Sequence, residues 1–153
     1  MEIIPIDDLF EKLANEASLL AGWANVWSSA GGPGGDNVSV QTFAAHLSPE
    51  INRLVEDLRN DHYIPGPVRR TTIPKRHGGF RPLAIPCVRD RVVQSALHLL
   101  LEPVLEPHFS ESSFAYRPGR GVVQAIRRVQ ELHRDGFHHV VDADITRFLY
   151  TAS

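Results

Sequence analysis

Apolar residues at helical spacing predict two helices in the first third of the chain. The first covers roughly residues 8–28 and opens on a capping-box-like pair, Asp8 and Glu11. The second begins at Ser48, which is the expected N-cap because a proline and an acid follow it. Between them, residues 29–37 hold four glycines and a proline, so the first helix must end there. A plain connecting loop and a phosphate-cradling loop both remain open for this stretch.

The pattern then changes from helical spacing to two short extended runs. PVRRTTIPK (67–75) and FRPLAIP (80–86) are rich in β-branched or apolar residues, and RHGG joins them. Gly78 and Gly79 can supply the positive φ of a tight turn. These residues therefore predict a β-hairpin.

Two further helices and a strand are predicted in the second half of the chain. A wide apolar stripe predicts a buried helix from Val88 to about Leu105, and the loop HFSESSFAYRPGRG (108–121) follows it. A second stripe predicts a helix over roughly 122–132 with Gly136 as a C-terminal cap. The run HHVVDADI (138–145) reads as a strand. Helices, a hairpin and a strand in this order predict an α+β fold rather than a doubly wound sheet.

Composition limits the class of protein. The 153 residues suffice for one modest domain, and 42% hydrophobic with 22% charged residues is typical of a soluble globular protein. No apolar run approaches the roughly 18 residues of a membrane span, and acids stand where a secretory signal carries bases. We therefore expect a cytoplasmic protein with no membrane partner. The single cysteine, Cys87, excludes an internal disulfide and a cysteine-based zinc site.

Charge is divided unevenly along the chain, although the net charge is only −2. Residues 1–61 carry three basic against ten acidic side chains, whereas residues 62–139 carry twelve basic against six acidic, and eleven of those twelve are arginines. An arginine-rich segment suits a polyanion because guanidinium groups bind phosphate with two donors at once. The alternative is that the two segments pack on each other through opposite charges.

The candidate chemistry lies in the predicted strand and in the hairpin. Alternate residues of a strand share a face, so Asp142 and Asp144 could hold a divalent ion such as Mg²⁺, or could cap the following turn instead. Lys75 and Arg81 flank the hairpin turn and can reach the same phosphate chain, unless they only form a solvated face. A basic arm combined with a metal-binding strand describes a site for nucleotidyl transfer.

Residues 60–148 resemble the fingers and first palm strand of group II intron-type bacterial reverse transcriptases, and CRISPR-associated reverse transcriptases are close relatives of these. The glycine-rich GGPGGDNVS (31–39) resembles the element that precedes the fingers in that family. The resemblance implies a truncated polymerase fold: an N-terminal helical extension (1–61), fingers (62–139) and the start of the palm (140–153).

The resemblance also implies roles for individual residues. Lys75 and Arg81 match the pair that contacts the incoming dNTP. Asp144 matches the catalytic aspartate that binds Mg²⁺ (or Mn²⁺) together with the carbonyl of Ile145, while Asp142 matches a less strict neighbouring position. Phe114 and Tyr116 are expected to pack. Arg117 and Arg120 match a loop that lies close to the nucleic acid. Arg69 and Arg70 are also assigned to nucleic acid, on the positive charge that they add near the hairpin rather than on the resemblance.

The family pattern changes after Phe148. Leu149 stands where the family places a second aromatic residue, and neither a second carboxylate block nor a thumb can be read in the sequence. We therefore expect an N-terminal fragment of an RNA-directed DNA polymerase that is inactive alone. The expected partners are an RNA template, a DNA or RNA primer and dNTP, with intron RNA or CRISPR adaptation proteins as further candidates. The alternatives are a non-catalytic RNA-binding fingers module and, ranked last, a D-x-D nucleotide-sugar glycosyltransferase.

Overall fold

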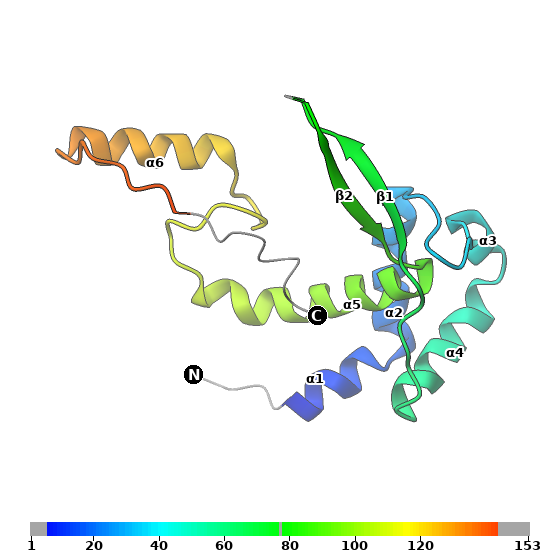
Figure 1. Ribbon diagram of the computed structural model, residues 1–153. Coiled ribbons are helices and arrows are strands. Elements are labelled where there is room, and N and C mark those ends of the chain that lie inside the picture. Colours follow the sequence, from blue (N-terminus) through cyan, green and yellow to red (C-terminus); the bar gives the residue numbers. More distant parts are fainter. Residues whose placement is uncertain (1–5, 77, 144–153) are drawn as a thin grey trace. The chain divides into compact units, whose positions relative to one another are not determined.

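The computed structural model describes residues 6–76 and 78–143 (Figure 1). Its contacts divide the chain into two compact units, one ending at Pro107 and the other beginning at His108. The predicted segments 1–61, 62–139 and 140–153 rest on family resemblance rather than on contacts, and they stay a prediction. Each unit is described by itself below.

The first unit begins with two helices where the sequence predicted one. Helix α1 covers Ile6–Leu13 and α2 covers Glu16–Ser29. The break occurs because Asn15 has an extended backbone and its side chain accepts a hydrogen bond from the Ala17 amide, which makes it the N-cap of α2. Asp8 does not stand at the start of a helix, as the capping-box pattern predicted. It lies inside α1 and forms an ion pair with Lys12 at 2.7 Å.

Two more helices precede the hairpin. Helix α3 (Val40–Ala45) was missed in the sequence, although Ser39 caps it by accepting a hydrogen bond from the Thr42 amide. Helix α4 covers Leu47–Arg59 and begins before Ser48, so the prediction that Ser48 is its N-cap is wrong. The N-cap is His46, whose side chain makes no capping hydrogen bond.

The predicted hairpin is confirmed. Strand β1 (Arg69–Pro74) pairs antiparallel with β2 (Phe80–Ile85), and the two are the green arrows of Figure 1. Gly78 and Gly79 have φ angles of 88° and 79°, which only glycine adopts readily.

The core of the first unit forms where α5 (Val88–Leu105) packs along α2. Gly22 permits the close approach, because a Cβ there would lie 2.5 Å from the carbonyl oxygen of Val92. The bounds of α5 match the prediction, but only its first half is buried. Beyond Ala96 the predicted buried stripe holds only in part: Leu100 still packs against the core, whereas Leu97 and Leu105 are well exposed. The fully buried large side chains of this unit are Leu19, Ile51, Leu54, Val88, Val92 and Cys87.

The second unit is a loop and one helix. A 3-10 turn (Glu106–His108) follows α5, and the loop leads to α6 (Val122–Arg134). Gly136 has a φ of 98° and ends α6 as predicted. Its amide donates to the carbonyl of His133, and the Phe137 amide donates to that of Leu132, which is the Schellman pattern. No residue between 108 and 143 is buried.

The predicted terminal strand is wrong over its described part, because residues 138–143 belong to no helix or strand. A strand needs a partner for its amide and carbonyl groups, and the sheet of the described residues contains β1 and β2 alone. The end of the prediction, residues 144–145, lies outside the described residues. Helices combined with a small antiparallel sheet confirm the α+β class. Among the residues that the structure describes, no helix has both the length and the apolar character of a membrane span.

Candidate nucleotide and nucleic-acid sites

The loop of the second unit is held by its own arginines. The Arg117 guanidinium donates to the carbonyls of Ser110 (2.6 Å) and Ser113 (3.0 Å) and lies 5.3 Å from the centre of the Phe109 ring. Arg120 donates to the carbonyl of Glu111. Both predicted nucleic-acid ligands therefore order the loop, and their binding role stays a prediction.

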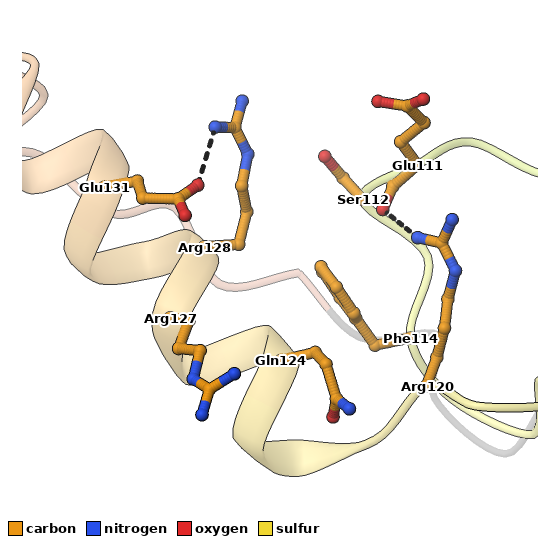
Figure 2. A pocket seen from close by; sticks show the side chains of 8 residues that line it. All are labelled: Glu111, Ser112, Phe114, Arg120, Gln124, Arg127, Arg128 and Glu131. Carbon is orange, nitrogen blue, oxygen red and sulfur yellow. Dashed lines mark hydrogen bonds and ion pairs between the residues drawn. The ribbon is translucent and has the colours of Figure 1, made fainter.

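A cationic pocket of about 520 Å³ lies between this loop and α6. Figure 2 shows Gln124, Arg127 and Arg128 on α6 and Arg120 on the loop. Arg128 forms an ion pair with Glu131 at 3.2 Å. These α6 residues were not predicted from the sequence, although an adjacent pair of arginines on an amphipathic helix is a signal that points to them. The complete lining is Glu111, Ser112, Phe114, Arg120, Gln124, Arg127, Arg128 and Glu131.

Tyr116 does not pack, contrary to expectation. Its side chain is fully exposed, and its φ of 57° lies in the left-handed region that bulky residues rarely adopt. Phe114, two residues earlier, is half-buried. Both aromatic residues line a second, more apolar hollow of about 340 Å³ with Arg120, Val122 and neighbouring small residues.

In the first unit, the strand register brings the predicted dNTP ligands to one face of the hairpin. Ile73 pairs with Arg81, and the Lys75 amide donates to the Gly79 carbonyl at 2.9 Å. Residues two positions apart on a strand share a face, so Lys75 and Arg81 are diagonal neighbours on the same side. Both side chains are exposed. They could bind two oxygens of one polyphosphate.

The other two hairpin arginines lie elsewhere. Arg69 pairs with Ile85 at the far end of the ladder, about 20 Å along the strand from Lys75 for six residues. Arg70 pairs with Ala84 and points to the opposite face. The structure therefore does not bring Arg69 and Arg70 to the turn, and their assignment to nucleic acid stays a prediction.

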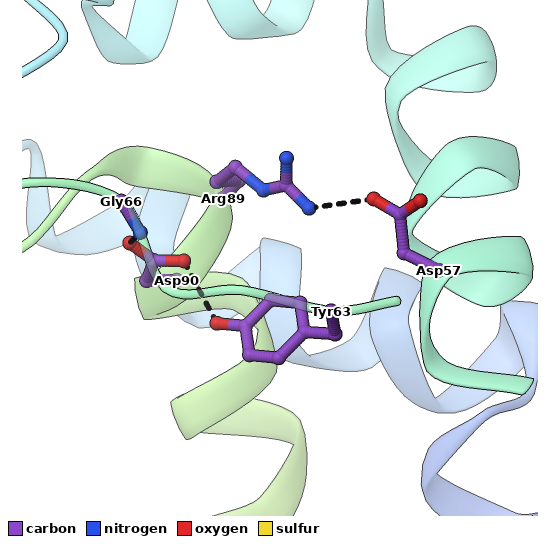
Figure 3. Close-up of polar contacts among 5 residues, drawn as sticks. All are labelled: Asp57, Tyr63, Gly66, Arg89 and Asp90. Atoms are coloured by element: carbon purple, nitrogen blue, oxygen red, sulfur yellow. Dashed lines mark hydrogen bonds and ion pairs between the residues drawn. The ribbon is translucent and has the colours of Figure 1, made fainter. Parts of the chain in front are cut away.

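A buried carboxylate anchors the segment that enters β1. Asp90, with only 2% of its surface exposed, accepts hydrogen bonds from the Tyr63 hydroxyl (2.7 Å) and the Gly66 amide (2.9 Å), as Figure 3 shows. Burial, reinforced by the bond to Asp90, raises the pKa of Tyr63 above its ordinary value. This site was not predicted from the sequence; the signal for it is an aspartate inside the apolar stripe of a buried helix.

Next to this anchor, Arg89 forms an ion pair with Asp57 of α4 at 2.8 Å, which is also drawn in Figure 3. The pair joins the basic middle of the chain to its acidic N-terminal segment. Part of the charge division therefore stabilises contacts within the first unit, as the opposite-charge alternative expected.

The glycine-rich loop packs against residues that neighbour this anchor in the sequence, Pro67, Cys87 and Arg91. The Gly35 amide donates to the Pro67 carbonyl at 3.0 Å, and Arg91 donates to the Gly32 carbonyl at 2.8 Å. A Cβ at Gly34 would lie 2.5 Å from the backbone of Cys87. These contacts favour the connecting-loop interpretation over a phosphate cradle, because glycine is needed here for close backbone packing.

The predicted metal ligands Asp144 and Ile145 lie outside the described residues. Asp142 is described and exposed. In residues 6–76 and 78–143, no group of three or more His, Cys, Asp or Glu side chains is arranged to hold a metal ion. The Mg²⁺ site therefore stays a prediction.

Comparison with known families decides which class of protein carries this hairpin. The family model described as "Reverse transcriptase (RNA-dependent DNA polymerase)" matches residues 73–151, which is just over half of the chain. The chain belongs to the reverse transcriptase family. The matched range begins in β1 and includes the turn, β2, α5 and α6.

Curated relatives agree with this family. Protein YkfC of Escherichia coli is 40% identical over 122 residues, covering 78% of this chain and 32% of that protein. The group II intron-encoded protein LtrA of Lactococcus lactis is 33% identical over 97 residues, covering 63% of the chain and 16% of LtrA. An uncharacterized 91 kDa protein in the cob intron of Schizosaccharomyces pombe is 38% identical over 79 residues, covering 52% of this chain and 10% of that protein.

These relatives confirm the resemblance to group II intron-type reverse transcriptases. The chain spans less than a third of the length of each of the three proteins. Membership of the reverse transcriptase family gives no support to the glycosyltransferase alternative.

Proposed function

We propose that this chain is the nucleotide-binding part of an RNA-directed DNA polymerase, which adds dNTP to a primer 3′-hydroxyl on an RNA template. The observation that carries the proposal is the shared face of Lys75 and Arg81 on an exposed hairpin within the family match. Lys75 supplies a compact charge and Arg81 a planar fork, so together they can neutralise the triphosphate of an incoming dNTP.

The anchor around Asp90 supports this role. A hairpin that binds substrate has to be held at a fixed angle, and the bonds from Tyr63 and Gly66 fix the segment that leads into β1. Buried hydrogen bonds to a carboxylate are strong compared with those on a surface, so the segment that enters the hairpin is held in place while the strands themselves are exposed.

The proposed metal ligands are Asp144 and the carbonyl of Ile145. A bound Mg²⁺ ion would supply charge stabilisation for the transferring phosphoryl group. The proposed partners are an RNA template with its DNA or RNA primer, and intron RNA is a further candidate because a relative is encoded in a group II intron. We propose the cytoplasm as the site of action, where both dNTP and RNA are available.

Primer extension by the protein that carries this sequence tests the proposal. Lys75→Ala should raise the KM for dNTP about 10-fold with a smaller change in kcat, because the lost contact binds the substrate triphosphate. Thr72→Ala is the matched control, since Thr72 is also exposed on β1 but pairs with Pro82 on the opposite face. Equal KM values for Lys75→Ala and the wild-type protein would contradict the assignment of the hairpin to dNTP binding.

A second candidate, a non-catalytic RNA-binding module, is favoured by the arginine-lined pocket beside α6. The two functions are separated by Asp144→Ala. A polymerase loses nucleotide incorporation and keeps RNA affinity, whereas a binding module shows no incorporation in either form.

A further inference from the structure

We propose that helix α2 pairs antiparallel with the α2 of a second copy of this chain, about a two-fold axis. The contact is made by four residues that we call the α2 seam: Ala17, Leu20, Ala24 and Trp27. The pairing goes beyond the proposed function and concerns the first unit alone.

Helix α2 is apolar on its open face as well as on the face that packs along α5. On the open face, Trp27 is 51% exposed and Leu20 is 38% exposed. Glu16, in the first turn, is the one charged residue of the helix. A surface helix normally carries charged or polar side chains opposite its buried stripe, and a helix that is apolar all round is normally buried. The open face of α2 therefore has the character of an interface.

The spacing of the α2 seam fits a helical partner. Its four residues are separated by three, four and three positions, which is the spacing of the a and d positions of a coiled coil. All four are exposed and lie on one stripe of the helix. A strict a/d stripe is narrow and fits one further helix, whereas a helix that faces a globular core carries a wider stripe.

The order of side-chain sizes along the seam identifies that further helix as a second α2. When two copies run antiparallel about a point midway between Leu20 and Ala24, these two residues lie opposite each other. Ala17 then lies opposite Trp27. Each layer joins a small side chain to a large one, which fills the space between the helices without a clash. A parallel pair would place Trp27 against Trp27 and leave a gap between the two Ala17 side chains.

Charge at the two ends of α2 agrees with the antiparallel direction. Glu16 is exposed at the N-terminal end. At the other end, Arg91 donates to the carbonyl of Gly32 at 2.8 Å, in the loop that leaves α2. In the antiparallel pair, Glu16 of each copy reaches the end at which the other copy carries Arg91. A parallel pair would bring the two Glu16 carboxylates together, which is unfavourable.

Trp27 is expected to contribute most to the contact. Its ring lies 5.6 Å from that of the buried Trp23, so the core of its own chain supports it before association. Tryptophan is enriched among the residues that dominate interfaces, and a pre-positioned side chain loses little entropy on binding. With 14 residues, α2 is about 21 Å long, so the interface is small and the dimer is weak.

Sedimentation velocity of the 153-residue chain from about 5 to 500 μM covers the affinities of a small interface. The wild type should dimerise as its concentration rises. Trp27→Glu should raise the Kd of the dimer at least about 30-fold, because a charge replaces the main aromatic contact. Ile126→Glu is the matched control, since it puts the same charge on an exposed apolar residue of α6, and its Kd should be unchanged. Circular dichroism checks that each variant retains its helices.

The size pattern is tested by exchange within the seam. Leu20→Ala leaves a gap against Ala24 of the second copy, and Ala24→Leu clashes with its Leu20, so each should weaken the dimer about 5- to 30-fold. The Leu20→Ala, Ala24→Leu double variant again joins a small and a large side chain in each layer, and it should regain most of the wild-type affinity. A double variant no stronger than the single ones would contradict the pairing.

The direction is tested by cysteine cross-linking. A mixture of Leu20→Cys and Ala24→Cys chains should form a mixed disulfide dimer. Ala17→Cys chains should not cross-link with each other, because antiparallel pairing separates these two positions by about 15 Å. The native Cys87 is 1% exposed and does not compete.

The inference is overturned if the wild type stays monomeric over this concentration range, or if Trp27→Glu dimerises as well as the wild type. Loss of the dimer in Ile126→Glu alone would place the interface on α6 and reject the α2 seam. Cross-linking between Ala17→Cys chains would show a parallel pair instead. The proposed function is tested separately, by the KM for dNTP in Lys75→Ala, and either can fail without the other.

Discussion

Helices α4 and α6 show the same apolar spacing and opposite burial. The stripe of α4, made of Ile51, Leu54 and Leu58, is only 1–6% exposed, whereas Val122, Ile126 and Val129 of α6 are 53–75% exposed. Both helices are amphipathic, and both were predicted from periodicity. Periodicity therefore predicts a helix and its apolar face, but it does not tell whether a neighbouring element covers that face.

The polar contacts of the two units differ in the same way. In the first unit, Asp90 is buried and its two hydrogen bonds fix the entry to the hairpin. In the second unit, Arg117 and Arg120 bond to carbonyls of an exposed loop. A buried polar group must be satisfied by the fold, whereas an exposed one can exchange its partner for water or a ligand.

The largest effect is expected when one apolar side chain in each helix, Leu54 in α4 and Ile126 in α6, is shortened to alanine. Leu54→Ala should lower the free energy of unfolding of the first unit by about 2–5 kcal/mol, because it removes packing from a closed core. Ile126→Ala should change it by less than about 0.5 kcal/mol. Urea unfolding followed by tryptophan fluorescence reports this unit, since Trp23 and Trp27 both lie in α2. An equal loss in both variants would show that the face of α6 is covered in solution.

A smaller effect is expected when a hydroxyl is removed from each of two tyrosines. Tyr63→Phe should cost about 1.5–3 kcal/mol, because the buried Asp90 loses a hydrogen-bond donor. Tyr116→Phe should leave stability unchanged, since that ring is fully exposed. Thermal unfolding of both variants provides the measurement. A stable Tyr63→Phe protein would mean that water replaces the hydroxyl at Asp90 and that the anchor is less enclosed than described.

The smallest effect on stability is expected for the two glycines that lie at the ends of α6. Gly136→Ala should cost about 1–2 kcal/mol locally, because alanine is disfavoured at a φ of 98°. Gly121→Ala is the control, since Gly121 has an extended φ of −176° that any residue adopts. Hydrogen exchange of the Gly136 and Phe137 amides should accelerate about 5- to 30-fold in the first variant only. Equal exchange in both would show that α6 ends without the glycine cap.

The sequence alone determined the features that depend on neighbouring residues. The hairpin turn follows from Gly78 and Gly79, and the end of α6 follows from Gly136, because glycine adopts positive φ at little cost. The side-by-side charges of Lys75 and Arg81 follow from strand alternation once the turn is known. The resemblance to reverse transcriptases also came from residue order alone, and the family match confirms it.

Only the tertiary structure decided which of these residues became buried, paired or exposed. Asp90 is enclosed by a segment more than twenty residues away, and Tyr116 projects from a loop in which arginines bond to carbonyls. Residues 138–145 were predicted as a strand, but their described part, 138–143, has no ladder partner among the described residues. Local geometry is set by a few adjacent dihedral angles, whereas burial and strand pairing require surfaces from distant parts of the chain to meet.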